Sequence, residues 1–229
     1  AKCVLDGLKG MNAFFDVFKL PFKKFATFLV PASIRLIMQL AYDKLCAVAD
    51  KIDFIETGAA PITHHDMKQL SIALPNARLY NTLGGTEIGA VCTYNFNDGK
   101  YMEGCIGRPV KNSSIQITDE GNIIVSGLTI MSGYVADQES TNKVLRDGKI
   151  YGSDLGYIDQ EGLIHLKGRQ GDVINVGGFK VDPSEVEGAI ASHPSVIDSI
   201  CIADHHPAIG TVLKLLVVLA EGEKLDKRS

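Results

Sequence analysis

Two glycines followed by a hydroxyl and a carboxylate form the first group of residues that could do chemistry. Its members are Gly84, Gly85, Thr86 and Glu87. Glycines let the backbone approach a ligand closely, and a hydroxyl beside a carboxylate offers the oxygen ligands that a phosphate group and its magnesium ion require. The competing interpretation is a Gly-Gly turn in which Thr86 is the N-cap of a following helix.

Asp154 ends a second short group, Tyr-Gly-Ser-Asp at residues 151–154. Its carboxylate could accept two hydrogen bonds from the diol of a ribose. Considered by itself, an aspartate in such a segment is more often an ordinary turn residue.

A third group begins with Gly168 and Arg169 and continues through Gly177 and Gly178 to Lys180. A guanidinium group is suited to a phosphate or a ribose, and a plain salt bridge is the alternative role for Arg169. Paired glycines, a strand and a capped helix give this group a coherent predicted structure.

The elements that must position these groups start with two helical stretches. Residues 11–30 hold six of the nine phenylalanines at spacings of mostly three or four, which predicts an amphipathic helix broken near Pro21. Packing on a core or on another domain is the preferred interpretation, and contact with a membrane surface or a fatty acyl chain is the alternative. Residues 31–50 are predicted to form the next helix.

A βαβ unit is predicted in the following stretch, up to about residue 100. Residues 52–55 read as a short apolar strand that runs into a turn of small residues at 57–61. Residues 64–74 are predicted to be helical, and residues 77–83 form a second strand that leads into residues 84–87.

From residue 104 to 168, short β-rich stretches alternate with Gly and Asp turns, which predicts a small antiparallel sheet or a barrel-like subdomain. Residues 170–172 are a predicted linker, and residues 173–229 a compact α+β module. Its helix is predicted from an N-cap at Asp182 to about Ser192, and its strands at 196–203 and 212–220. The expected fold is multi-domain α/β, with a large domain over residues 1–169 and a smaller module over 170–229.

Composition argues against several classes of function. The 229 residues carry a net charge of -4 with no strong basic block, so we expect no nucleic-acid partner. The five cysteines are scattered, which argues against a disulfide framework and a zinc site and fits a reducing cytoplasm. No apolar run reaches the roughly 18 residues of a membrane span, and we expect no membrane contact. All six histidines are interpreted as surface or loop residues: His64, His65, His165, His193, His205 and His206.

In this order and spacing, the groups together resemble the acyl-adenylate-forming superfamily, which includes acyl-CoA synthetases, nonribosomal adenylation domains and beetle luciferases. The resemblance covers nearly the whole chain. The matching segments are residues 57–61 (the adenine-side turn), 84–87 (Tyr-Gly-x-Thr-Glu), 104–109, 125–134, 151–154 (Tyr-x-Thr-Gly-Asp) and 168–187 (the hinge and the start of the mobile C-terminal domain).

The resemblance implies a role for each group. Thr86 would contact the α-phosphate, Glu87 would bind Mg²⁺, and Asp154 would hold the ribose hydroxyls with help from Arg169. The backbone at Gly58, Ala59 and Ala60 would flank the adenine. The other implied cofactor-binding residues are Leu83, Gly84, Gly85, Gly177, Gly178 and Lys180. The implied cofactors are ATP or AMP, Mg²⁺ and coenzyme A as a co-substrate.

The sequence departs from the family pattern at several positions. Leu83 stands where the family usually has an aromatic residue on the adenine, and Ser153 replaces the usual glycine. Gly171 occupies the hinge position, and Asn175 falls where some relatives carry a lysine used in the second half-reaction. The family's phosphate loop and its C-terminal catalytic lysine are missing. We therefore expect a fragment, truncated at both ends and inactive in adenylation by itself.

The expected function of the parent protein is that of an acid–thiol ligase. Such an enzyme activates a small carboxylic acid with ATP as an acyl-adenylate and transfers it to coenzyme A. A carrier-protein ligase or adenylation domain, with an acyl carrier protein as partner, is the second hypothesis. A non-catalytic binding module on the same scaffold is the third. The expected location is the cytoplasm.

Overall fold

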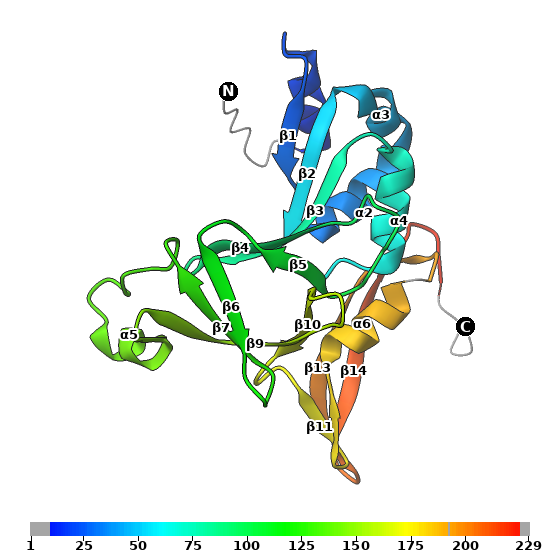
Figure 1. Cartoon of the computed structure of the whole chain (residues 1–229). Coiled ribbons are helices and arrows are strands. Elements are labelled where there is room, and N and C mark those ends of the chain that lie inside the picture. Colours follow the sequence, from blue (N-terminus) through cyan, green and yellow to red (C-terminus); the bar gives the residue numbers. More distant parts are fainter. Residues whose placement is uncertain (1–9, 192, 225–229) are drawn as a thin grey trace. The chain divides into compact units, whose positions relative to one another are not determined.

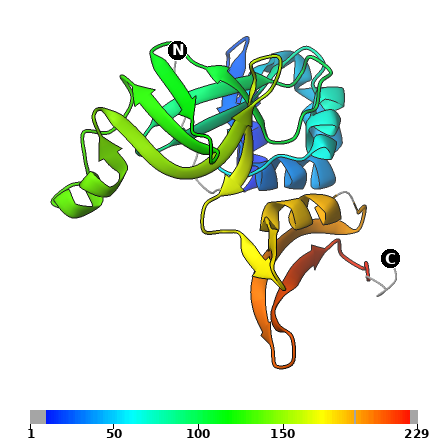
Figure 2. The same cartoon turned by 60° about the horizontal axis from the view of Figure 1, so that its bottom comes forward.

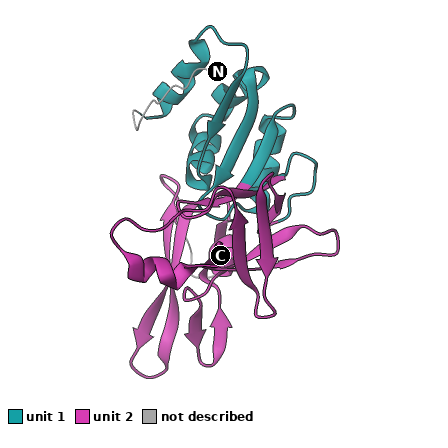
Figure 3. Cartoon of the chain, turned by 60° about the vertical axis from the view of Figure 1, so that its left-hand side comes forward, with its two compact units in different colours: residues 1–81, 95–102 teal, residues 82–94, 103–229 magenta. Residues whose placement is uncertain are grey.

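The computed structural model describes residues 10–191 and 193–224, and the chain forms two compact units (Figure 3). The first unit holds the described residues up to 81 together with residues 95–102, and the second holds residues 82–94 and the described residues from 103 onward. The predicted division between residues 169 and 170 stays a prediction.

The first unit combines short helices with strands that lie mainly in its middle (Figure 1). Its helices are α1 (Met11–Asp16), η1 (Val17–Lys19), α2 (Pro31–Leu40), α3 (Tyr42–Ala47), η2 (Ala49–Lys51) and α4 (His64–Ala73). Its strands are β1 (Phe25–Phe28), β2 (Ile52–Gly58) and the first half of β3 (Arg78–Gly85). Strand β1 pairs with β2 in parallel. The succession β2, α4, β3 confirms the strand–helix–strand order predicted for residues 52–83.

The phenylalanine-rich segment differs from the amphipathic helix predicted for residues 11–30. The helical turns end at Lys19, and Phe25–Phe28 forms strand β1. Pro21 lacks an N–H and interrupts the helix as expected, and phenylalanine rings from both sides of it pack as a cluster. Phe18 is buried between Phe14 and Phe25 in edge-to-face contacts with centroid distances of 5.4 and 5.0 Å. Among the described residues, no helix is long and apolar enough to cross a membrane.

The single helix predicted for residues 31–50 is divided in the structure. The break falls at Ala41, whose φ of -148° and ψ of 29° leave the helical region. Helix α4 begins with a complete capping box: Thr63 Oγ1 accepts from Asp66 N at 3.1 Å, and Asp66 Oδ2 accepts from Thr63 N at 3.4 Å. Arg35 of α2 donates to the same Oδ2 at 2.9 Å, so one carboxylate fixes the start of α4 and its contact with α2.

The second unit is built mainly on antiparallel strands. Its main elements are β4 (Gly89–Asn95), β5 (Cys105–Pro109), β6 (Ser113–Ile117), β7 (Asn122–Gly127), helix α5 (Gln138–Val144), β8 (Leu145–Arg146), β9 (Lys149–Ile158) and β10 (Ile164–Arg169). The strand order is β4-β5-β10-β9-β7-β6, with β8 on β9. No pairing among the described strands closes this order, so the unit has an open sheet instead of a barrel. Its core is a cluster of Val91, Cys92, Ile106, Ile123, Val125 and Ile164.

The last part of the second unit contains two hairpins and a helix (Figure 2). The elements are β11 (Ile174–Val176), β12 (Phe179–Val181), α6 (Pro183–Ala191), β13 (Val196–His206) and β14 (Gly210–Leu219). Helix α6 packs against β13. The predicted N-cap is confirmed, because Asp182 Oδ1 accepts from the backbone N of Ser184 at 2.9 Å. The predicted helix end at Ser192 lies outside the described residues. The fold is mixed α/β, as the sequence predicts.

Candidate functional site

Residues 84–87 lie where β3 ends and the chain turns back into β4. The backbone N of Ile88 donates to the carbonyl of Gly85 at 3.3 Å, which closes a tight turn with Thr86 and Glu87 at its tip. The interpretation of Thr86 as a helix N-cap is wrong, because a strand and not a helix follows. The turn leaves Thr86 exposed and Glu87 half-buried.

A loop over residues 129–134 holds this turn through three hydrogen bonds. Thr129 Oγ1 donates to the carbonyl of Ile88 at 2.7 Å, and the backbone N of Met131 donates to the carbonyl of Glu87 at 2.8 Å. The third bond is made to the carboxylate of Glu87, since Tyr134 Oη donates to Glu87 Oε1 at 2.9 Å. This bond is the first cause of a raised pKa at Tyr134, since the hydroxyl loses it on ionisation.

Tyr134 is the residue that sequence reasoning left out of the site. The signal was present, because residues 131–134 belong to a segment that matches the family. The segment was not linked to Glu87, which lies 47 positions earlier.

Asp154 and Arg169 form the second part of the site. They are register partners on β9 and β10, and Arg169 Nε donates to Asp154 Oδ1 at 2.8 Å. The pKa of Arg169 is raised, first by the hydrogen bond and charge of Asp154 and then by the carboxylates of Asp172 and Glu87. The charge of Glu87 also acts on Arg169, as the smallest of these causes. The observed contact is the salt bridge that was one of the two interpretations of Arg169.

The remaining predicted residues occupy other places. Gly177 and Gly178 form the turn of the separate β11–β12 hairpin, where Gly178 N donates to Asn175 Oδ1 at 3.0 Å. Lys180 is exposed and lies opposite Asn175 in that hairpin. The second unit holds residues 83–85 together with Thr86. The first unit holds residues 58–60. Ala59 is exposed and takes a left-handed φ of 65°, which makes a sharp turn after β2.

The chemistry of the turn fits a magnesium ion. Carboxylate oxygens are preferred magnesium ligands, and Tyr134 occupies only Oε1 of Glu87. A Cβ at Gly85 would lie 3.8 Å from Glu87 Oε2, so the absence of a side chain at position 85 keeps space open beside this oxygen. In the described part of the chain, no three His, Cys, Asp or Glu side chains gather in a way that could hold a metal ion. Glu87 would therefore be one protein ligand among phosphate and water oxygens.

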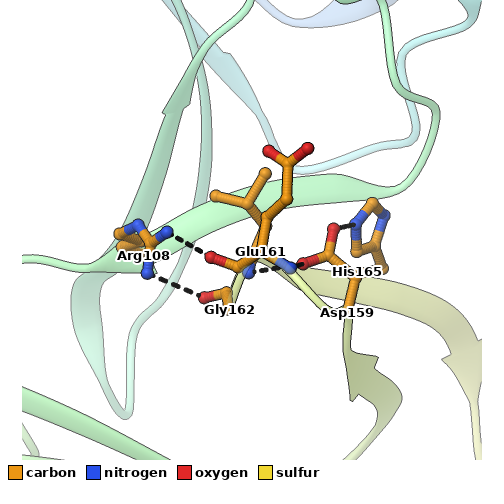
Figure 4. Close-up of polar contacts among 6 residues, drawn as sticks. Arg108, Asp159, Glu161, Gly162 and His165 are labelled. Atoms are coloured by element: carbon orange, nitrogen blue, oxygen red, sulfur yellow. Dashed lines mark hydrogen bonds and ion pairs between the residues drawn. The ribbon is translucent and has the colours of Figure 1, made fainter.

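The turn between β9 and β10 is fixed by a polar cluster (Figure 4). Asp159 accepts from Leu163 N and Glu161 N at 2.8 and 2.9 Å and lies 2.8 Å from His165 Nε2. These contacts lower the pKa of Asp159, with the Leu163 bond the largest cause. Arg108 donates to the carbonyls of Glu161 and Gly162. The cluster fixes the pairing of β9 with β10 next to the turn, and a one-residue bulge at Lys167 then brings Asp154 opposite Arg169.

The interpretation of all histidines as surface or loop residues is wrong for His165. This residue lies in β10 with 7% of its surface exposed. Its ring stacks on that of Tyr157, with the centroids 4.9 Å apart and the planes 12° from parallel. The His165 ring can be buried because its Nε2 forms a hydrogen bond with the carboxylate of Asp159.

The mixed α/β fold, the turn at residues 84–87 and the Asp154–Arg169 pair agree with the resemblance to adenylate-forming enzymes. The comparisons agree: residues 22–135 match the family described as AMP-binding enzyme. This match covers 114 of the 229 residues, and it confirms the predicted similarity to adenylate-forming enzymes.

Curated relatives include several ligases. A long-chain-fatty-acid–CoA ligase of Bacillus subtilis is 33% identical over 70% of this chain and 31% of its own length. The mitochondrial acyl-coenzyme A synthetase ACSM4 of Rattus norvegicus is 32% identical over 75% of this chain and 32% of its own length. The 4-coumarate–CoA ligase 1 of Glycine max is 30% identical over 75% of this chain and 64% of its own length. The chain thus spans about a third of the first two relatives.

Solved structures confirm the fold. ATP-bound MatB of Rhodopseudomonas palustris has a TM-score of 0.78 and 25% identity, over 94% of this chain and 44% of that one. The amide bond synthetase McbA of Marinactinospora thermotolerans has a TM-score of 0.80 and 22% identity, over 94% of this chain and 46% of that one. The second likeness concerns the fold alone.

Proposed function

We propose that the protein carrying this chain is an ATP-dependent acid–thiol ligase that forms an acyl-adenylate and transfers the acyl group to coenzyme A. The observation that carries the proposal is the pair formed by Asp154 and Arg169 on neighbouring strands, with 2.8 Å between Oδ1 and Nε, in the same unit as the Gly-Gly-Thr-Glu turn. The similarity to fatty acyl-CoA and 4-coumarate–CoA ligases supports it and suggests a fatty or aryl carboxylic acid as substrate.

In the first half-reaction, the substrate carboxylate attacks the α-phosphorus of ATP and pyrophosphate leaves. The exposed hydroxyl of Thr86 would donate to an α-phosphate oxygen, and Glu87 would hold Mg²⁺ through Oε2. A bound magnesium ion supplies charge neutralisation at the phosphates. The contribution of the protein is mainly to position the two reactants, because such a displacement needs no covalent intermediate on the enzyme.

Asp154 would hold the ribose of the nucleotide. Arg169 donates to Oδ1, so the other carboxylate oxygen, Oδ2, would accept from the ribose hydroxyls. The guanidinium of Arg169 fixes the orientation of the carboxylate and brings positive charge to the site. We also propose that Leu83, in the same unit as Asp154, makes apolar contact with the adenine.

The second half-reaction is proposed to involve a movement of the segment that follows Gly171. This glycine has a φ of 105°, and a Cβ built on it would meet no atom within 4 Å. Such a position can absorb large backbone changes. The β11–β12 hairpin, which holds Gly177, Gly178 and Lys180, would then contribute to the transfer of the acyl group to coenzyme A. The proposed location is the cytoplasm, on the ground of the scattered cysteines.

The test is ATP–pyrophosphate exchange by the complete protein with a panel of fatty and aryl acids, followed by thioester formation with coenzyme A or an acyl carrier protein. We expect one class of acid to stimulate exchange and Glu87→Ala to lower it by about 100-fold or more. The control is Glu139→Ala, since this carboxylate is 83% exposed and paired with Lys143. If no acid stimulates exchange, the ligase proposal is wrong. Transfer only to a carrier protein would favour the carrier-protein ligase.

A further inference from the structure

Tyr134 is anchored at its backbone, and its side chain reaches Glu87. Its backbone N donates to Thr141 Oγ1 at 2.9 Å. Thr141 is buried on α5, and its hydroxyl in turn donates to the carbonyl of Asp137 at 2.8 Å. Tyr134 and Asp137 also form an isolated antiparallel bridge. The backbone of Tyr134 is therefore fixed by a half-buried polar contact, although the residue as a whole is 37% exposed.

The hydroxyl of Tyr134 uses this anchor to hold one end of the Glu87 carboxylate. Oη donates to Oε1 at 2.9 Å, while Oε2 lies on the side left open by Gly85. A glutamate side chain loses rotamer entropy when it is fixed. A donor that fixes it in advance lowers the cost of ligating a cation with the free oxygen.

We propose that Tyr134 is a positioning residue, which orients the Glu87 carboxylate so that Oε2 faces the cation that accompanies the nucleotide phosphates. The inference rests on the proposed function, in which Glu87 is a magnesium ligand. It adds a residue 47 positions away whose hydroxyl acts only through that carboxylate.

The test measures metal binding directly and does not depend on turnover. The complete protein is titrated with Mn²⁺ in the presence of saturating AMP, and free Mn²⁺ is followed by electron paramagnetic resonance. Tyr134→Phe keeps the ring and removes the donor, and it should raise the Mn²⁺ dissociation constant about five-fold or more. The affinity for AMP without metal should change less than two-fold.

Two further variants separate positioning from general loosening. Tyr157→Phe removes the hydroxyl of a tyrosine that stacks on His165, and it should leave Mn²⁺ binding unchanged. Thr129→Val removes a different hydrogen bond from the same loop to the same turn. If Thr129→Val weakens Mn²⁺ binding as much as Tyr134→Phe does, turn stability explains the effect and the positioning role is overturned.

Glu87→Gln distinguishes failure of the inference from failure of the proposed function. If Glu87→Gln weakens Mn²⁺ binding and Tyr134→Phe does not, the inference is wrong and the metal role of Glu87 stands. If the native protein with AMP binds no Mn²⁺, or Glu87→Gln has no effect, the metal role fails and the inference fails with it. In the Glu87→Gln background, Tyr134→Phe should raise the Mn²⁺ dissociation constant by less than a further two-fold. The reason is that Tyr134 acts through the carboxylate, which the Glu87→Gln variant lacks.

Discussion

Asp154 and Arg169 lie directly opposite each other on β9 and β10, with 2.8 Å between Oδ1 and Nε. The pairing of these strands is fixed at their other end by Asp159, which binds two backbone N–H groups of the connecting turn and the ring of His165. The polar cluster and the one-residue bulge at Lys167 therefore together determine which residues face each other at the proposed ribose site.

Asp154→Asn should weaken AMP binding about ten-fold while leaving the fold intact. The amide keeps the shape of the carboxylate but loses its charge, and hydrogen bonds to a charged group contribute about 1 kcal/mol more than neutral ones. Isothermal titration calorimetry with AMP measures the change. The matched control is Asp204→Asn, which removes the carboxylate of another cross-strand ion pair, 3.0 Å from Lys214. Equal AMP affinity of native protein and Asp154→Asn would contradict the ribose role.

Local signals predicted the parts of the fold that depend on neighbouring residues. The helix start at Asp182 was predictable because the cap bond reaches only to Ser184. The β-rich region was predictable because turn residues punctuate short apolar stretches. The break at Ala41 carried no signal, since alanine is the strongest helix former. Residues 25–28 were misread because phenylalanines at spacings of three fit a helix pattern as well as a packed ring cluster.

The contacts that sequence reasoning missed at the site span long distances in the chain. The bond between Tyr134 and Glu87 joins residues 47 apart. The burial of His165 depends on Asp159 and on the ring of Tyr157 across the strand pair. No periodicity records such pairs, because they form only when separate strands and loops pack together. A salt bridge was one of the two interpretations of Arg169, but the sequence did not identify Asp154 as its partner.

Gly107→Ala should destabilise the second unit more than Gly148→Ala. Both glycines have positive φ, 76° and 68°, so both variants bear the left-handed penalty of about 1–2 kcal/mol. A Cβ at Gly107 would also lie 2.1 Å from the carbonyl oxygen of Thr93, whereas one at Gly148 would meet nothing within 4 Å. We expect Gly107→Ala to lower the free energy of unfolding by about 2 kcal/mol more than Gly148→Ala. Urea denaturation measures both values, and equal losses would contradict the steric explanation.

Cys92 should resist alkylation in the folded protein. Its side chain is fully buried, and burial, assisted by the neighbouring Cys105, raises its pKa from 9.0 to about 12. This shift lowers the thiolate fraction at pH 8 by roughly 1000-fold, and the thiolate is the reactive form. Peptide mapping after iodoacetamide treatment should show Cys46, which is half-buried, modified well before Cys92. In denaturant the two should react at similar rates. Early modification of Cys92 without denaturant would show that the β4 core opens readily.

Asp159→Asn should remove part of the loss of stability that occurs in acid. The pKa of Asp159 is lowered in the folded state, mainly by the hydrogen bond from Leu163 N and then by His165. A carboxyl group with a lowered folded pKa contributes stability above its unfolded pKa of about 3.9, and this contribution disappears as the pH falls through the folded pKa. The difference in stability between native protein and Asp159→Asn should therefore be constant from about pH 6 to pH 5 and shrink below about pH 4. Thermal unfolding across this range measures it, and a difference that stays constant down to pH 3 would contradict the assignment.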